Sequence, residues 1–181
     1  RKRYVNYRKS DRQIIPKNSR TKMRLILCAF LFVLLGCGST IQSSKNLKNE
    51  EIVFSTISKG KLFGNGIEGI IEEKFTITNE KQWQVFLNKI NSVNNVSLSF
   101  TETNINFSNH IIICVFDAIR NTGGYAIEIK RVFVEKNNLN IVYTKKGPGP
   151  MEMVTTAITQ PYHIVKIEKR GDDHKFINKN Q

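Results

Sequence analysis

The 181-residue sequence predicts an α+β fold, in which one main helix packs on a mostly antiparallel β-sheet or a small sandwich. Two observations lead to this expectation. The segment between residues 79 and 93 repeats its apolar side chains at helical spacing. Between residues 111 and 167 the chain instead consists of short runs that are either nearly all apolar, as at 111–119, or alternate apolar and polar residues. Short connections between such runs imply antiparallel pairing of the strands.

The first part of the chain has the composition of an export signal. Residues 1–22 carry nine Arg or Lys side chains and one acidic residue, and an apolar run of eleven residues extends from Leu25 to Leu35. This run is too short to cross a bilayer, which needs about 20 apolar residues. We therefore expect residues 1–36 to be a basic n-region and signal peptide. If Met23 is the true start, residues 1–22 are a mis-called extension.

The residues around Cys37 make this signal more specific. Leu34-Leu35-Gly36-Cys37 resembles the lipobox of a bacterial lipoprotein. The resemblance implies cleavage before Cys37 and acylation of its sulfur and new amino group, which attaches the protein to a membrane of the bacterial cell envelope. In enteric bacteria, an Asp directly after the lipidated cysteine favours retention in the inner membrane. This chain has Gly38 at that position, so by analogy we expect the outer membrane. The polar composition of residues 37–51 predicts a flexible tether after the lipidated cysteine.

The composition after the signal excludes several classes of function. Residues 37–181 contain 18 basic and 14 acidic side chains, a net charge of +4. This ordinary surface does not predict a nucleic-acid-binding protein. The three histidines are not spaced as zinc ligands, so we expect no metal and no cofactor. Cys114 lies in an apolar run, where a thiol acts as a small buried hydrophobe.

Residues 52–169 are expected to form a single globular domain, followed by a frayed tail at 170–181. The helix begins after Asn79, because Asn at this position with Gln82 three residues later is a typical N-terminal cap. Its apolar stripe consists of Trp83, Phe86, Leu87, Ile90 and Val93.

The remaining apolar runs predict strands. Asn137-Asn138 marks a hairpin turn, and the change of alternation phase near Lys130-Arg131 indicates a β-bulge. The strands are expected within Ile67–Ile77, Ile111–Ile119, Tyr125–Val134, Leu139–Tyr143, Met153–Ile158 and Tyr162–Ile167.

Three connecting segments, 121–125, 147–151 and 160–163, carry Gly or Pro together with an aromatic or Met side chain. Aromatic and Met side chains are typical of protein contact surfaces. We therefore predict that the three segments converge into one surface that binds a protein partner. Its residues are Tyr125, Pro148, Met151, Tyr162 and His163.

An apolar strand, then Asn121-Thr122-Gly123-Gly124-Tyr125, a hairpin, a Gly/Pro loop and Gln160-Pro161-Tyr162-His163 together resemble the PrcB C-terminal family. The resemblance covers about residues 111–168. It implies a bacterial envelope lipoprotein. The family's namesake is an accessory, non-catalytic component of a surface protease complex. The resemblance makes a protease one candidate for the protein partner. Because the chain also has no catalytic signature, we expect that it is not an enzyme.

Two alternatives remain open. The three segments are similar, in order, to the loops of chagasin-type cysteine-protease inhibitors, although the first lacks a proline and the third ends in Tyr rather than Trp. An enzyme is the other alternative, with a site near His110 or Asp117. A catalytic role requires a pocket in which polar groups converge. The simpler expectation is that Asp117 is a buried acid held by Arg120 or by a backbone donor, and we predict no catalytic residue.

Overall fold

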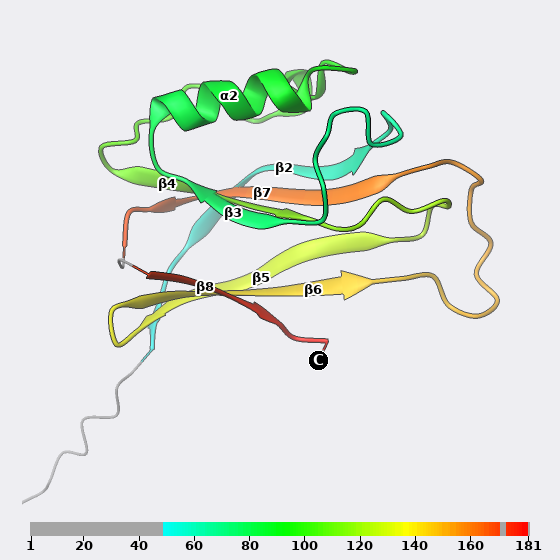
Figure 1. Ribbon diagram of the computed structural model, residues 1–181. Coiled ribbons are helices and arrows are strands. Elements are labelled where there is room, and N and C mark those ends of the chain that lie inside the picture. The colour runs from blue at the N-terminus through cyan, green and yellow to red at the C-terminus, as the bar shows by residue number, and fades with distance from the viewer. Residues whose placement is uncertain (1–48, 171–172, 181) are drawn as a thin grey trace, which may run out of the picture. The chain divides into compact units, whose positions relative to one another are not determined.

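The computed structural model describes residues 49–170 and 173–180 (Figure 1). The predicted signal peptide, the lipidation site Cys37 and most of the predicted tether lie outside the described residues. The part of the tether that is described differs from the prediction. Glu50 and Glu51 form a short strand that pairs with Val134 and Phe133.

The described residues form two four-stranded sheets, one helix and a short 3-10 helix. The first sheet has the order β1-β5-β6-β8 and the second β2-β7-β4-β3. Neighbouring strands are antiparallel except for β6 and β8, which are parallel. The bounds are β1 Glu50–Glu51, β2 Phe54–Leu62, β3 Lys74–Ile77, α2 Glu80–Ile90, η2 Val96–Ser99, β4 His110–Phe116, β5 Ala126–Glu135, β6 Asn138–Lys146, β7 Gln160–Glu168 and β8 Asp173–Asn178.

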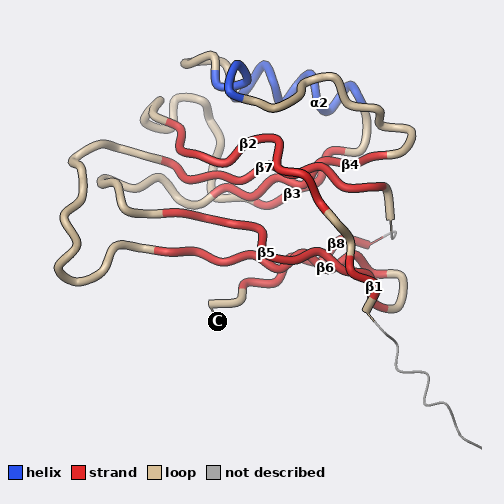
Figure 2. Tube along the Cα trace, turned by 180° about the vertical axis from the view of Figure 1, so that it is seen from behind, coloured by secondary structure: helices blue, strands red, loops and turns tan. Residues whose placement is uncertain are grey.

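The sheets and the helix form three layers, with the β2-β7-β4-β3 sheet in the middle (Figures 1 and 2). On one face of this sheet, Ile112 and Ile164 belong to the same buried cluster as Trp83 and Phe86 of the helix. On its other face, side chains such as Val165 pack in a second cluster with residues of β5 and β6. The broad α+β prediction therefore fits, and the sheets stack as a sandwich.

The position of the middle sheet explains why β4 is apolar at consecutive residues. Ile111, Ile113 and Val115 face the other sheet, whereas Ile112 and Cys114 face the helix. A strand buried on both faces loses the alternation that a half-exposed strand shows. β7 follows the same rule, because residues 160–165 are all buried.

Helix α2 begins as predicted. Asn79 is its N-cap, and the Asn79 side-chain oxygen accepts a hydrogen bond from the Gln82 N–H (3.0 Å). Trp83 is fully buried, and its indole N–H donates to the Thr103 carbonyl (2.8 Å). The helix ends at Ile90, so Val93 lies beyond it and is exposed.

The predicted β-bulge and hairpin are both confirmed. The pairing of β5 with β6 shifts register between Ile129 and Arg131. The hairpin turn consists of Lys136 and Asn137, which have φ values of 50° and 68°. Two consecutive positive φ values are typical of a two-residue hairpin turn. The turn lies one residue before the predicted pair.

Several predicted elements differ from the structure. Only residues 74–77 of the predicted strand Ile67–Ile77 form a strand, because residues 64–69 contain turns with positive φ at Gly66 and Gly69. β2 was not predicted. The segment Met153–Ile158 is not a strand. The 117–125 loop donates one backbone hydrogen bond to it, at the Thr155 carbonyl, and forms an isolated bridge with Thr159 just after it.

The tail is also ordered where fraying was predicted. Residues 173–178 pair with β6 as strand β8, and Phe176 packs against the cluster between the sheets. The His174 Nδ1 atom lies 2.8 Å from the Thr76 hydroxyl of β3. These contacts with distant residues hold a segment whose polar composition does not by itself predict a strand.

Candidate protein-binding surface

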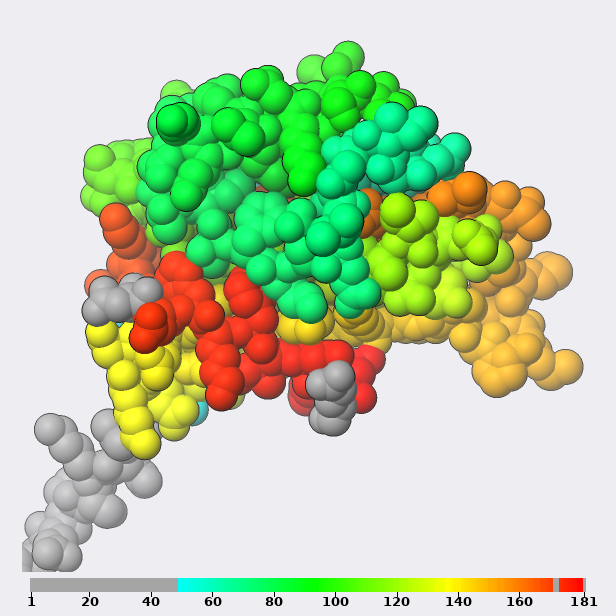
Figure 3. Space-filling model, in the orientation of Figure 1, coloured from blue at the N-terminus to red at the C-terminus, as the bar shows by residue number. Residues whose placement is uncertain are grey.

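Three loops meet at one end of the domain: 63–73, 117–125 and 147–159 (Figures 1 and 3). The Gly123 N–H donates to the Thr155 carbonyl (2.9 Å), and Arg120 and Thr159 exchange two backbone hydrogen bonds of 2.8 Å. The buried side chain of Gln160 donates from Nε2 to the carbonyls of Ile70 and Asp117, each at 3.0 Å. Hydrogen bonds therefore join all three loops.

An ionic network around the buried Asp117 fixes the loops further. The Asp117 carboxylate is 1% exposed and accepts hydrogen bonds from the Arg120 guanidinium (2.9 and 3.1 Å), while the Lys145 ammonium lies 2.7 Å from it. Lys145 also pairs with Glu72 of the first loop. Burial raises the pKa of Asp117, but hydrogen bonds from Lys145 and Arg120 outweigh this effect, so the pKa lies below its ordinary value.

The Gly123-Gly124 pair lets the second and third loops approach each other. Gly124 has a φ of +83°, which glycine adopts without strain. A Cβ atom at Gly124 would lie 2.9 Å from Cβ of Pro148 and 2.8 Å from Cγ1 of Val154. The next residue, Tyr125, stacks under the Arg120 guanidinium, whose carbon lies 4.6 Å from the ring centroid. The loops are consequently held in one arrangement.

These loops carry most of the exposed large hydrophobic side chains of the described residues. Eleven such side chains are exposed, and seven of them lie on the three loops. A gathering of exposed apolar side chains at one place is typical of an interaction surface. We name this set the loop-end patch: Phe63, Ile67, Ile71, Ile119, Met151, Met153 and Ile158.

Of the five binding residues predicted from the sequence, three lie on the loops and two are buried in a strand. Met151 is 97% exposed and belongs to the loop-end patch. Tyr125 and Pro148 are half-buried where the second and third loops approach each other, near Gly147 and Gly124. Tyr162 and His163 are each only 3% exposed. The prediction that they belong to a contact surface is wrong, because segment 160–163 is the start of the middle strand β7 rather than a loop.

His163 instead links the two sheets. The Ile129 N–H of β5 donates to its Nδ1 atom (2.9 Å), so Nε2 carries the proton and donates to the Thr56 hydroxyl (3.0 Å). Burial and the nearby Lys59 cation lower the pKa of His163 to about 4. The neutral imidazole is therefore a structural group at neutral pH.

Six residues of the loop-end patch were not predicted as a surface. Ile67 and Ile71 were assigned to a strand, and so were Met153, Ile158 and Ile119. The signal that distinguishes the first loop is its glycines, since Gly64, Gly66 and Gly69 interrupt any strand. Sequence periodicity alone does not separate an apolar residue at a loop tip from one in a core.

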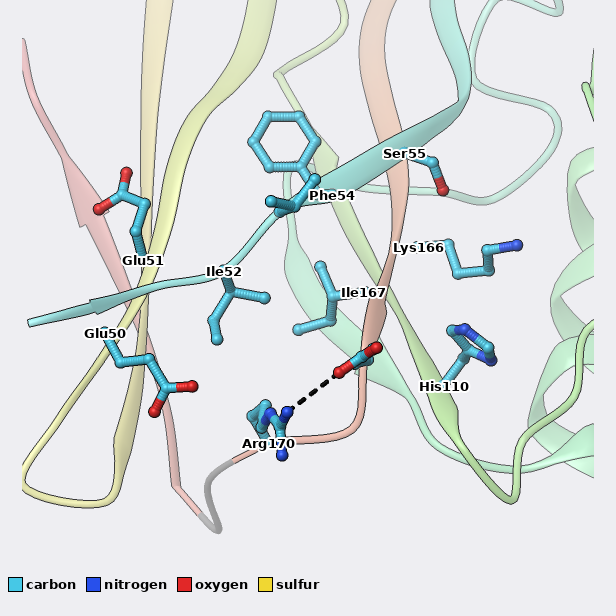
Figure 4. A pocket seen from close by; sticks show the side chains of 11 residues that line it. Glu50, Glu51, Ile52, Phe54, Ser55, His110, Lys166, Ile167 and Arg170 are labelled. Carbon is cyan, nitrogen blue, oxygen red and sulfur yellow. Dashed lines mark hydrogen bonds and ion pairs between the residues drawn. The ribbon is translucent and has the colours of Figure 1, made fainter.

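The two residues suggested for an enzyme lie at opposite ends of β4. Asp117 is held by two cations in the network described above. His110 borders a cavity of about 420 Å³ beside β1 and the start of β2. Figure 4 shows the His110 and Lys166 side chains on one side of this cavity and Glu51 on the other, so these polar groups do not converge.

Burial makes Cys114 a core residue, as predicted, and raises the pKa of its thiol well above the ordinary value. Among the residues that the structure describes, no cluster of three or more His, Cys, Asp or Glu side chains is arranged to hold a metal ion. In the same residues, no helix has the length and apolar composition needed to cross a membrane.

The described fold is a two-sheet β-sandwich with one covering helix. The family model described as PrcB C-terminal matches residues 111–168, which extend from β4 to the end of β7. The resemblance predicted from the sequence is thus confirmed over these residues. The search of curated proteins found no match, and neither did the search of solved structures.

Proposed function

We propose that this chain is a lipid-anchored protein of the bacterial cell envelope and acts as a non-catalytic accessory subunit. In this proposal Cys37 carries the lipid, and the loop-end patch binds a protein partner that belongs to a surface protease complex. The outer membrane is the proposed location.

The loop-end patch is the observation that carries this proposal. Met151 and Met153 are 97% and 99% exposed, and their loop is tied to the 117–125 loop by backbone hydrogen bonds. A rigid apolar surface loses little conformational freedom when it binds, and this makes association more favourable. The similarity of residues 111–168 to the PrcB C-terminal family supports a protease complex as the partner.

The inhibitor alternative receives less support from the fold. It requires three exposed loops at one end of a sandwich, and the third of these was segment 160–163. Pro161 and Tyr162 are buried in β7, and the Tyr162 ring stacks on Phe116 with a centroid distance of 5.8 Å. An aromatic side chain in this position does not reach a protease cleft.

Site-specific photo-crosslinking in the producing bacterium tests the proposed surface. A photoreactive phenylalanine analogue replaces Met153 in one strain and Leu98 in the control strain. Leu98 is 84% exposed and lies on η2, outside the patch. We expect a discrete adduct from position 153, identified by mass spectrometry as a protease-complex component, and none from position 98. Equal labelling from both positions, or none from position 153, would contradict the proposal.

A Cys37→Ser variant tests the anchor separately. Without the sulfur no lipid is attached, so the variant should leave the membrane fraction while the wild-type protein stays in it. Detergent-phase partitioning and intact-mass measurement check this result. Retention of the variant in the membrane, or a wild-type mass without acyl chains, would count against lipidation but would leave the loop-end patch untouched.

A further inference from the structure

We propose that the groove between helix α2 and strand β3 binds an extended segment of a partner protein, which adds to the middle sheet as a further strand. The groove has a volume of about 400 Å³ and is lined by one side of the helix and one side of the strand. It begins beside the loop-end patch at Ile70 and extends along β3. We name it the α2–β3 groove.

The first argument is the open edge of β3. This strand is the last in the order β2-β7-β4-β3 and pairs only with β4 among the described strands. The Phe116 N–H donates to the Glu73 carbonyl (2.9 Å), which identifies residues 73 and 75 as hydrogen-bonded positions in this antiparallel pair. The alternation of such pairs directs the N–H and C=O groups of Lys74 and Thr76 away from β4. These groups form a short template for another strand.

The opposite edge of the same sheet is different. At β2, the Thr101 N–H donates to the Ile57 carbonyl (3.0 Å), and the Thr101 hydroxyl donates to the Thr56 carbonyl (3.2 Å). The chain thus covers part of that edge with its own residues. Figure 3 shows β3 and α2 on the face turned to the viewer.

The second argument is the apolar lining beside the open edge. Phe75 and Ile77 of the strand and Phe86 of the helix form its floor. Val85 lines the helix side and is 62% exposed. A strand that pairs with β3 places alternate side chains on the helix side of the sheet. An apolar side chain there replaces water in the groove, whereas the backbone hydrogen bonds hold the segment in register.

The third argument is charge. Lys81 and Lys89 lie four residues either side of Val85, so all three follow one line along the helix. Both lysines line the groove. Glu73 is the one acidic residue in this lining, and its Oε1 atom lies 3.9 Å from Nζ of Lys89. Lys81 makes no ion pair with any described residue. The occupant is consequently an extended segment whose alternate, groove-facing positions carry apolar residues together with an acidic residue that reaches the lysines.

Selection from a display library of random ten-residue peptides on the full chain in detergent solution tests this assignment. We expect enriched peptides to alternate apolar residues and to contain Asp or Glu. Binding of a synthetic enriched peptide should slow hydrogen exchange in residues 74–77.

Two matched pairs of variants locate the binding. Val85→Glu places a charge in the groove and should weaken binding at least about tenfold, a loss of 1.4 kcal/mol, whereas Leu98→Glu should not. Thr76→Pro removes the outward N–H without affecting a β4 hydrogen bond, and it should also weaken binding. Thr76→Ala keeps that N–H and also loses the hydroxyl, so it is the control for the side chain.

The proposal is wrong if no peptide is enriched, or if Val85→Glu and Thr76→Pro bind as well as their controls. It is equally wrong if the chain self-associates through a Val85-sensitive contact and binds no peptide, because the groove then belongs to a second copy. Crosslinking from position 153 does not depend on the peptide experiments. If the groove binds no peptide, the proposed function is therefore still tested by that crosslinking.

Discussion

His163 has a structural role that its position in the sequence does not indicate. His163 was expected at a surface, yet it joins the two sheets through the Ile129 N–H and the Thr56 hydroxyl. Its ring nitrogens are both used in the neutral form, one as acceptor and one as donor. Protonation of Nδ1 removes the acceptor for Ile129, so the neutral state is the one compatible with the fold.

This geometry predicts a pH dependence of stability. The pKa of His163 is about 4 in the folded protein and about 6.5 when unfolded, so the unfolded state takes up the proton first as pH falls. The contribution of His163 to the free energy of unfolding is complete above pH 6.5. It decreases by roughly 3 kcal/mol as the pH falls to 4. Urea unfolding at a series of pH values measures it.

The matched variant for this measurement is His163→Gln, which does not titrate. Both proteins share the same carboxylates, so the difference between their pH profiles isolates the imidazole. The Gln variant should lose less stability between pH 6.5 and pH 4. Parallel profiles for the two proteins would show that His163 does not carry the effect.

At the scale of elements, the loops are determined by contacts that the strands bring together. Asp117 follows β4, Lys145 lies near the end of β6 and Glu72 precedes β3, yet one network joins them. The predicted pairing of Asp117 with Arg120 is confirmed, because these residues are neighbours along the chain. The contribution of Lys145 was not predictable, since it requires the two sheets to stack.

Gly124→Ala tests how tightly the loops are held. The alanine needs a positive φ and places its Cβ within 3 Å of Pro148 and Val154. We expect a loss of about 1–3 kcal/mol in the free energy of unfolding and weaker crosslinking from position 153. Gly149→Ala is the control, because its nearest neighbour, Oε2 of Glu152, would lie 3.9 Å from the new Cβ. Equal effects of the two substitutions would mean that the loops are not constrained at Gly124.

At the scale of the whole described domain, both hydrophobic clusters depend on the same middle sheet. Ile112 belongs to the cluster under the helix, whereas its neighbours Ile111 and Ile113 belong to the cluster between the sheets. The loss of β4 therefore disrupts both at once. A domain with this arrangement should unfold in a single cooperative step.

The single tryptophan makes this prediction measurable. Trp83 is buried in the cluster under the helix, so its fluorescence reports on that layer alone. Far-ultraviolet circular dichroism reports chiefly on the eight strands. The two signals should change at the same urea concentration. An earlier fluorescence transition would show that the helix separates from a sandwich that remains folded.

Several local features of this protein follow from short sequence patterns. The cap at Asn79, the bulge between Ile129 and Arg131 and the hairpin at Asn137 depend on neighbouring residues, so their patterns predict them. Which apolar residues are buried depends instead on how the sheets and the helix pack. Tyr162 is covered by the helix layer, whereas Met153 is 99% exposed at a loop tip, although the sequence assigned both to strands. Burial depends on which distant segments pack together, and no local pattern contains that information.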